Sequence, residues 1–265
     1  MLPTPTTSHI DERKIYEPAE DSFLFLDTLS APAEIQFLTQ RFGPSAARDA
    51  APLIVEIGTG SGVILAFLTA HAHTLFGTTH LLTVGTDVNW FACKDSQQTV
   101  RRASNLAFTS NAIQPPPTAA YHAEFLGILN SDLASPLRPG TVDLLLFNPP
   151  YVPSSGVPCA PTEPHTPRDD EDPKRDSDLI SVSYEGGLDG MEVTQRLLDQ
   201  LGSILNKRTG VAYVLLCKQN RPDEVIGRLR GESCWSVDVV GRSGSFAGWE
   251  KLQIIRICCQ QETIE

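Results

Sequence analysis

The stretch "LIVEIGTGSG", Leu53–Gly62, decides the fold, because it leads from a strand-forming run straight into a turn in which every second residue is glycine. Its largely continuous hydrophobicity is typical of a strand covered on both faces of a parallel sheet. Glycines allow a tight turn and let main-chain N–H groups approach a ligand. A helical pattern follows at Gly62–Ala72. The stretch therefore predicts a strand, a turn and a helix of an open α/β sheet.

Further short apolar runs predict strands, and amphipathic stretches between them predict helices. The other expected strands are Leu81–Thr86, Tyr121–Asn130, Val142–Phe147, Val211–Cys217, Cys234–Val240 and Lys251–Ile257. The other expected helices are Glu20–Phe42, Trp90–Phe108, Met191–Leu205 and Pro222–Leu229. A short loop, Gly241–Glu250, joins the last two strands, so we expect them to be antiparallel neighbours. The sequence thus predicts an α/β fold with about seven strands, most of them parallel.

The chain is expected to form a single domain over residues 1–265, since 41% hydrophobic residues at this length can bury one sizeable core. One segment, about residues 153–183, departs from the pattern. It is rich in proline, and between Cys159 and Asp178 it holds seven acidic residues against three basic ones. Such a composition buries too little apolar surface to fold alone, so we predict a flexible insertion within the domain.

Composition disfavours several classes of function. The apolar runs are too short to span a bilayer and the N-terminus lacks an apolar signal core, so the sequence predicts a soluble, intracellular protein. The formal charge of −11 disfavours binding to a nucleic-acid backbone, which needs clustered Lys and Arg. The six cysteines show neither a C-x-x-C pair nor zinc-ligand spacing, so no metal site is expected.

Three strand ends carry residues suited to a nucleoside cofactor. Glu56, Gly58 and Gly60 belong to the glycine turn, which matches neither a dinucleotide fingerprint nor a P-loop. Asp87 ends the next strand, where a carboxylate can accept hydrogen bonds from ribose hydroxyls. Asp132 follows a third strand, where it could accept from an adenine amino group. Taken singly, these features could equally be a tight corner, a helix cap and a turn aspartate.

Together they predict a pocket along the edge where open α/β sheets bind ligands. The glycine turn carries no basic residue, and the carboxylates of Glu56 and Asp87 would repel phosphates while suiting a cationic ligand. S-adenosylmethionine, an adenosine that carries a sulfonium and an amino group, fits this description.

The segment "FNPPY", Phe147–Tyr151, ends a fourth strand abruptly. Its two prolines fix φ and lack N–H groups, which leaves carbonyls that can face a pocket. If the Asn148 side-chain oxygen and the Pro149 carbonyl each accept one N–H of a planar NH₂ group, the nitrogen lone pair is held toward a methyl donor. Tyr151 would pack its ring against the same group. The motif therefore predicts direct N-methyl transfer without a metal or a covalent intermediate.

The order of "VEIGTGSG", "TD", "DL" and "FNPPY" resembles class I S-adenosylmethionine-dependent methyltransferases of amino groups. This resemblance implies a Rossmann-like, seven-stranded sheet with helices on both faces and a reversed terminal strand. "IYEPAEDSFLFLDTL", "GGLDGMEVTQRLL" and "AGWEKLQIIRI" are similar to the eukaryotic HemK-like enzymes that methylate the glutamine of the Gly-Gly-Gln motif in the class-1 translation termination factor. The resemblance covers nearly the whole chain. It implies that this chain has the same glutamine methyltransferase activity and uses S-adenosylmethionine as its cofactor. It also implies a location in the cytoplasm, or in both the cytoplasm and the nucleus.

Carried over by position, the resemblance assigns cofactor binding to Ser22, Glu56, Gly58, Gly60, Asp87, Asp132, Leu133 and Asn148. Leu133 would act through its backbone N–H. The substrate amide would contact Asn148, Pro149 and Tyr151. An N-terminal helical segment, about residues 15–42, would form a lid shaped by Tyr16, Pro18 and Asp21. The family also implies a heterodimer with a small zinc-binding methyltransferase activator protein, docked on the sheet edge near Tyr121–Asn130.

Three alternatives stay open. A protein lysine methyltransferase fits the motif less well, because an ammonium must first lose a proton, although acidic residues could attract basic tails. An adenine methyltransferase of nucleic acid suits the motif but lacks an evident basic groove. A cofactor-binding scaffold without catalysis would have no need of Asn148.

Overall fold

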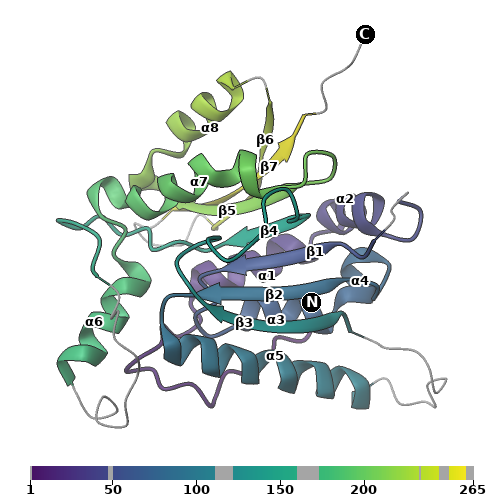
Figure 1. Cartoon of the computed structure of the whole chain (residues 1–265), viewed down its shortest axis with the longest axis horizontal. Coiled ribbons are helices and arrows are strands. Elements are labelled where there is room, and N and C mark those ends of the chain that lie inside the picture. The colour runs from purple at the N-terminus through teal and green to yellow at the C-terminus, as the bar shows by residue number, and fades with distance from the viewer. Residues whose placement is uncertain are drawn as a thin grey trace.

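A computed structural model describes residues 2–46, 50–110, 122–159, 173–232, 234–244 and 251–260. Its centre is one seven-stranded sheet in the order β3-β2-β1-β4-β5-β7-β6 (Figure 1). The strands are Leu53–Ile57 (β1), Leu82–Asp87 (β2), Glu124–Asn130 (β3), Leu144–Phe147 (β4), Val211–Cys217 (β5), Trp235–Arg242 (β6) and Leu252–Cys259 (β7). Neighbouring strands are parallel except that β7 runs antiparallel to both β5 and β6. The predicted α/β sheet with a reversed terminal strand is confirmed.

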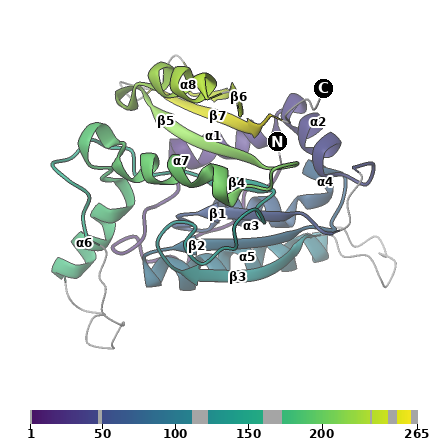
Figure 2. The ribbon, with the colours of Figure 1, turned by 45° about the horizontal axis from the view of Figure 1, so that its top comes forward.

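Helices cover both faces of this sheet. The α-helices are Glu20–Ser30 (α1), Pro32–Phe42 (α2), Val63–Ala70 (α3), Ala72–Phe76 (α4), Trp90–Ser110 (α5), Pro173–Tyr184 (α6), Glu192–Ile204 (α7) and Pro222–Gly231 (α8). The short 3-10 helices Leu188–Gly190 (η2) and Lys218–Asn220 (η3) precede α7 and α8. Helices α1 to α5 pack on one face, and α7 and α8 pack on the other (Figure 2).

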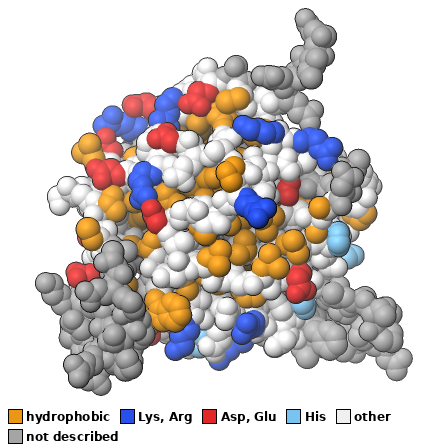
Figure 3. All heavy atoms as spheres, viewed as in Figure 1, with side chains coloured by type: hydrophobic (Ala, Val, Ile, Leu, Met, Phe, Trp, Pro, Cys, Tyr) orange, Lys and Arg blue, Asp and Glu red, His pale blue; other side chains and the backbone are white. Residues whose placement is uncertain are grey.

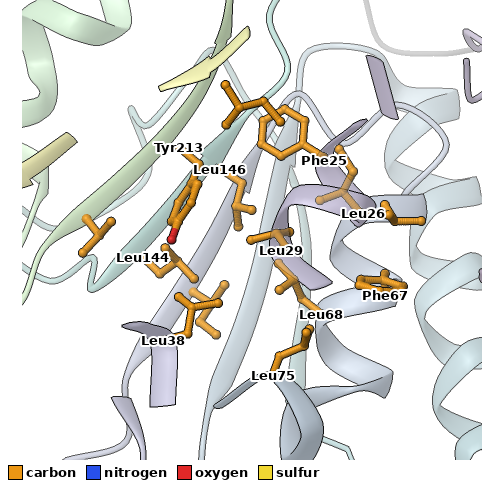
Figure 4. Packing of buried hydrophobic residues seen from close by; sticks show 14 of the residues in the cluster. Phe25, Leu26, Leu29, Leu38, Phe67, Leu68, Leu75, Leu144, Leu146 and Tyr213 are labelled. Carbon is orange, nitrogen blue, oxygen red and sulfur yellow. The ribbon is translucent and has the colours of Figure 1, made fainter. Parts of the chain in front are cut away.

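Alternating side chains of the strands supply the two cores. Ile54 joins the hydrophobic cluster under α1 to α4, whereas its neighbour Val55 joins the cluster under α7 and α8. On the first face, Leu144, Leu146 and Tyr213 of the central strands meet the apolar side chains of the helices (Figure 4). Because both faces are buried, the strands carry the continuous hydrophobic runs from which the sheet was predicted.

The helical pattern at Glu20–Phe42 forms two helices rather than one. They meet at Ala31, whose φ of −63° and ψ of 137° are extended, and Pro32 begins α2. A proline disfavours the helical conformation of the residue before it, which explains the break. Phe25 and Leu29 of α1 are fully buried, so this helix is part of the core. The lid function of the segment stays a prediction.

The acidic segment at about residues 153–183 contains a helix, α6, that the sequence analysis does not predict. It projects at the carboxyl end of the sheet in both ribbon views (Figures 1 and 2). Its Leu179 side chain is buried, and the carbonyl of Tyr184 accepts a 2.8 Å hydrogen bond from the Val152 N–H. Residues 160–172 lie outside the described residues, so the flexibility expected there stays a prediction. None of the helices in the described part of the chain has the length and hydropathy to cross a bilayer.

Candidate functional site

A cavity of about 410 Å³ lies at the carboxyl ends of β1, β2, β3 and β4. Most of the residues predicted from the sequence line it, namely Tyr16, Asp21, Ser22, Glu56, Gly58, Gly60, Asp87, Asp132, Leu133, Asn148 and Pro149. Two predicted residues, Pro18 and Tyr151, are not part of its lining. The parallel strands bring the lining residues from Glu56 to Pro149 together, because the carboxyl ends of β1 to β4 share one edge of the sheet, and the N-terminal segment adds Tyr16, Asp21 and Ser22.

Two buried carboxylates mark one end of the cavity. Glu56 is 2% exposed, and its Oε2 accepts a 2.9 Å hydrogen bond from the Leu65 N–H. Asp87 accepts from the N–H of Gly60 through Oδ2 and from the N–H of Asn89 through Oδ1, both at 2.8 Å. Burial raises the pKa of Asp87, and it raises the pKa of Glu56 well above its ordinary value. A cationic ligand would stabilise the ionised forms of both groups, whereas a phosphate would oppose them.

The glycine turn is required for two different reasons. Gly58, Gly60 and Gly62 all have positive φ, at 66°, 49° and 76°. A Cβ at Gly60 would meet no atom within 4 Å, so this residue borders open cavity space. A Cβ at Gly62 would lie 2.6 Å from the Cα of Ser96, so Gly62 allows α3 and α5 to approach closely. Gly60 therefore serves the ligand site, and Gly62 serves helix packing.

The N-terminal segment closes another side of the cavity. The Asn89 side-chain amide donates a 2.7 Å hydrogen bond to the carbonyl of Lys14, next to the lining residues Ile15 and Tyr16. At the start of α1, Asp21 Oδ1 accepts from the Ser22 N–H at 2.6 Å. Both partners in each bond are buried. The segment before α1 is thus tied to the residues that follow β2.

Asp132 and Leu133 follow β3. The Asp132 carboxylate forms an ion pair with Arg196 of α7, which also lines the cavity. Leu133 has a φ of 48°, and its carbonyl accepts a 2.9 Å hydrogen bond from the Thr86 hydroxyl. The roles of Asp132 and Leu133 toward adenine stay predictions. Arg196 is a cationic lining residue that the sequence analysis did not identify.

Asn148 differs from the buried carboxylates of the cavity. Its Oδ1 is buried and has no hydrogen-bond partner among the residues that the structure describes, a property that it shares with the Ser131 hydroxyl oxygen of the same lining. Leaving such an acceptor unpaired costs about 1–3 kcal/mol, and native proteins seldom do so without a reason. The atom lies directly after β4 and beside Pro149 at the cavity wall. Because Asn148 lines the cavity, a donor that enters the cavity is the partner that this position suggests for the oxygen.

Tyr151 follows the acceptor pair in the chain but is not part of the cavity lining. Its side chain is 8% exposed and belongs to the hydrophobic cluster under α1 to α4. Its carbonyl accepts a 3.0 Å hydrogen bond from the side-chain amide of Asn220. The expected packing of its ring against a substrate stays a prediction.

Many lining residues were not predicted from the sequence. They include Thr59, Asn89, Phe147, Val157, Leu179, Val182, Ser183 and Arg196. Three of them belong to α6, inside the segment predicted to be a flexible insertion. The spacing of Leu179 and Val182 in "DLISV" is typical of one face of a helix, and this pattern could have revealed them.

The polar groups of the lining fit a nucleoside that carries a positive charge. The lining provides buried carboxylates for hydroxyl groups, an open glycine turn and one cation, Arg196, which already pairs with Asp132. Within the described ranges, no group of three or more His, Cys, Asp or Glu side chains is placed to bind a metal ion.

Comparison with known proteins gives the family. No protein-family model matches the chain. Methyltransferase HEMK2 of Mus musculus is 30% identical over 258 residues, which cover 96% of this chain and 96% of that protein. The eRF1 methyltransferase catalytic subunit mtq2 of Schizosaccharomyces pombe is 30% identical over 260 residues, with coverage of 97% and 96%. Methyltransferase HEMK2 of Homo sapiens is 28% identical over 259 residues, with coverage of 96% and 95%. This identity along almost the entire length, on a fold whose strand ends build the predicted cavity, shows that the chain belongs to the HEMK2 family of methyltransferases.

Proposed function

We propose that this methyltransferase uses S-adenosylmethionine to methylate the side-chain amide nitrogen of a glutamine, the one in the Gly-Gly-Gln motif of the class-1 translation termination factor. The observation that carries the proposal is the buried Asn148 Oδ1, which has no partner in the described part of the chain. An amide NH₂ is a donor of matching geometry. The name of the Schizosaccharomyces pombe relative, an eRF1 methyltransferase catalytic subunit, supports the choice of substrate.

We assign cofactor binding to the end of the cavity that holds the carboxylates of Glu56 and Asp87. A carboxylate has about four acceptor sites, and backbone N–H groups do not use all of those of Asp87, so it can accept from a ribose hydroxyl as well. Glu56, held by the Leu65 N–H, is a second carboxyl group, and a bound cationic ligand would favour its ionised form against the effect of burial. When bound, the sulfonium cofactor supplies an electrophilic methyl group.

We assign binding of the target glutamine amide to the part of the cavity wall that holds Asn148. A primary amide has two N–H bonds in one plane, and Asn148 Oδ1 with the Pro149 carbonyl could accept one each. Two fixed acceptors orient the nitrogen and keep electron density on it, which is the contribution expected from positioning and preorganised dipoles. A lysine ammonium has three donors in a tetrahedral arrangement and suits this pair less well. The apolar side chains of Phe147, Leu179 and Val182 in the cavity wall help to exclude water.

The substrate is tested by offering methyl-labelled S-adenosylmethionine with three acceptors, namely release factor, histone and duplex DNA. We expect label on the release factor alone, and none on a matched release factor whose Gly-Gly-Gln glutamine is replaced by leucine. Label on DNA alone, on histone alone or on no acceptor would contradict the proposal. Translation termination takes place in the cytoplasm, so this substrate implies a cytoplasmic location.

We also propose a small zinc-binding activator protein as the partner, docked on β3. This strand forms one edge of the sheet, and its Leu126 and Leu129 side chains are 57% and 41% exposed. Hydrophobic side chains also gather over the face of β1 to β3 (Figure 3). An open edge with exposed apolar residues favours pairing with another chain.

Co-expression tests the partner. The double substitution Leu126→Asp and Leu129→Asp is expected to abolish co-purification with the activator. Leu188→Asp is the matched control, because Leu188 is 69% exposed on η2 and belongs to neither β3 nor its neighbours. Equal recovery of the activator with both variants would exclude β3 as the docking surface.

A further inference from the structure

Asn220 is a buried polar residue that does not belong to the cavity lining but contacts the backbone of the "FNPPY" turn. It ends η3, just after β5, and is 2% exposed. Its Nδ2 donates to three carbonyls, those of Tyr151 at 3.0 Å, Asp189 at 2.9 Å and Gly190 at 3.3 Å. Its Oδ1 accepts from the Cys217 N–H at 2.8 Å. One side chain thus joins the end of β5, the turn before α7 and the segment that follows Asn148.

Glycines hold the other side of the same backbone. A Cβ at Gly190 would lie 1.9 Å from the Tyr151 carbonyl oxygen, and a Cβ at Gly186 would lie 2.3 Å from the Pro150 carbonyl oxygen. The Gly186 N–H also donates a 2.8 Å hydrogen bond to the carbonyl of Val152. The backbone after Asn148 is therefore confined between Asn220 and the turn at residues 186–190.

The link from Tyr151 back to Asn148 is stiff. Pro149 and Pro150 are the only residues between them, and proline fixes φ near −65°. A displacement at the Tyr151 carbonyl has few free dihedral angles that could absorb it. It would therefore move the Asn148 side chain and the Pro149 carbonyl, which belong to two lining residues of the cavity.

We propose that Asn220 is a positioning residue for methyl transfer, which holds the acceptor pair of Asn148 and Pro149 in place through the Tyr151 carbonyl. The inference rests on the proposed function, because it assumes that this pair binds the target NH₂ group. The chemistry of the position requires an amide. Nδ2 must donate to a group of carbonyls while Oδ1 accepts from Cys217, and aspartate would place a second acceptor against those carbonyls.

The test compares Asn220→Asp with Asn220→Ala in the full-length protein, with release factor and labelled S-adenosylmethionine. We expect the single-turnover transfer rate to fall about 10- to 100-fold, the loss expected from a misplacement of about 1 Å. The dissociation constant of S-adenosylhomocysteine should change by less than about three-fold, because the Asp87 and Glu56 contacts are untouched. Backbone amides in residues 151–156 should exchange hydrogen for deuterium faster than in the wild type.

Tyr213→Phe is the control for general destabilisation. Tyr213 also lies on β5, but its hydroxyl donates to Glu34 in the core on the α1 to α4 face. This variant should lose stability without losing transfer rate per folded molecule. A second readout is a double-mutant cycle, in which Asn220→Asp should have little further effect in an Asn148→Ala background.

Each outcome separates the two proposals. A fully active Asn148→Ala, or a wild type that labels no release factor, overturns the proposed function, and hydrogen exchange then decides the role of Asn220 alone. Slow transfer by Asn148→Ala together with full rates and unchanged exchange in both Asn220 variants overturns only the inference. A loss of cofactor affinity equal to the loss of rate also overturns it. If Asn220→Ala does not fold, the result for Asn220→Asp decides whether the inference holds. This variant keeps the shape of the side chain and an oxygen that can accept from the Cys217 N–H.

Discussion

The two ends of the cavity differ in how far the protein alone satisfies their polar groups. At the cofactor end, the carboxylates of Glu56 and Asp87 already accept hydrogen bonds from backbone N–H groups. At the target end, Asn148 Oδ1 has no partner within the described residues. The first end is complete as folded and can bind a ligand in addition. Under the proposed function a ligand supplies the missing partner at the second end, which is the arrangement expected where binding must favour the reacting geometry.

The two ends also differ in how the chain builds them. The cofactor end comes from the ends of β1 and β2 and from the turn between β1 and α3. The target end combines β4 with α6 and relies on contacts to η2 and η3. The comparison predicts that substitutions at the two ends separate catalysis from cofactor affinity.

Asn148→Ala should give the largest effect. Removing one preorganised polar group at a reacting centre typically costs about 10²- to 10³-fold in rate, and we expect that loss in the transfer rate. Cofactor affinity should stay nearly unchanged, because the truncated oxygen has no partner in the described part of the chain. Methyl-transfer assays and calorimetry with S-adenosylhomocysteine measure the two quantities. Full activity would show that the unpaired oxygen has no catalytic role.

Asp87→Asn should give the converse result. A hydrogen bond to a charged group contributes about 1.5–3 kcal/mol, so we expect the cofactor dissociation constant to rise about 10- to 100-fold. The single-turnover rate at saturating cofactor should fall much less. The asparagine oxygen can still accept one of the two backbone N–H bonds, so the fold should persist. An unchanged dissociation constant would remove Asp87 from the cofactor site.

The sequence predicted the cofactor end almost completely, for a simple topological reason. Once the apolar runs are taken as parallel strands, residues that end adjacent strands must meet at one edge, and Glu56 and Asp87 are such residues. Only local pattern and the order of the strands are needed. Even the break of the first helical pattern at Pro32 follows a local rule that could have been applied.

The target end was predicted only in part: the motif indicated Asn148 and Pro149, but the contacts that support them are distant in sequence. Asn220 reaches the carbonyl of Tyr151 across 69 residues, and no local pattern reveals such a pair. The Tyr151 side chain packs in the hydrophobic cluster under α1 to α4, a contact that the motif did not reveal, and its expected role at the substrate stays a prediction. In α6, a high acidic content concealed the apolar spacing of Leu179 and Val182, so the composition suggested flexibility.

Two glycines of one turn sharpen the comparison at the cofactor end. Both Gly60 and Gly62 have positive φ, where alanine costs about 1–2 kcal/mol. Only at Gly62 does the new Cβ meet Ser96, which adds about 1–3 kcal/mol for overpacking. Gly62→Ala should therefore lower the free energy of unfolding more than Gly60→Ala, as measured by urea denaturation. Gly60→Ala should weaken cofactor binding more, because Gly60 lines the cavity and Gly62 does not.

The smallest effect concerns the dependence of stability on pH. Burial raises the pKa of Glu56 well above its ordinary value, with the nearby Asp87 charge adding to it. Between the ordinary and the raised pKa, the unfolded chain has released this proton while the folded protein keeps it. The contribution of Glu56 to the free energy of unfolding is therefore fully present below the pKa of the unfolded chain. It is lost as the pH rises through the higher pKa of the folded protein.

Glu56→Gln removes this titration but keeps an oxygen that can accept from the Leu65 N–H. The free energy of unfolding, measured by denaturant titration from about pH 4.5 to pH 7.5, should fall less with rising pH in the variant than in the wild type. Each unit of pKa difference corresponds to about 1.4 kcal/mol. Glu12→Gln, at an exposed position, is the matched control and should leave the slope unchanged. Equal slopes in all three proteins would mean that Glu56 is ionised in the folded state at neutral pH, held by the N–H bond strongly enough to offset its burial.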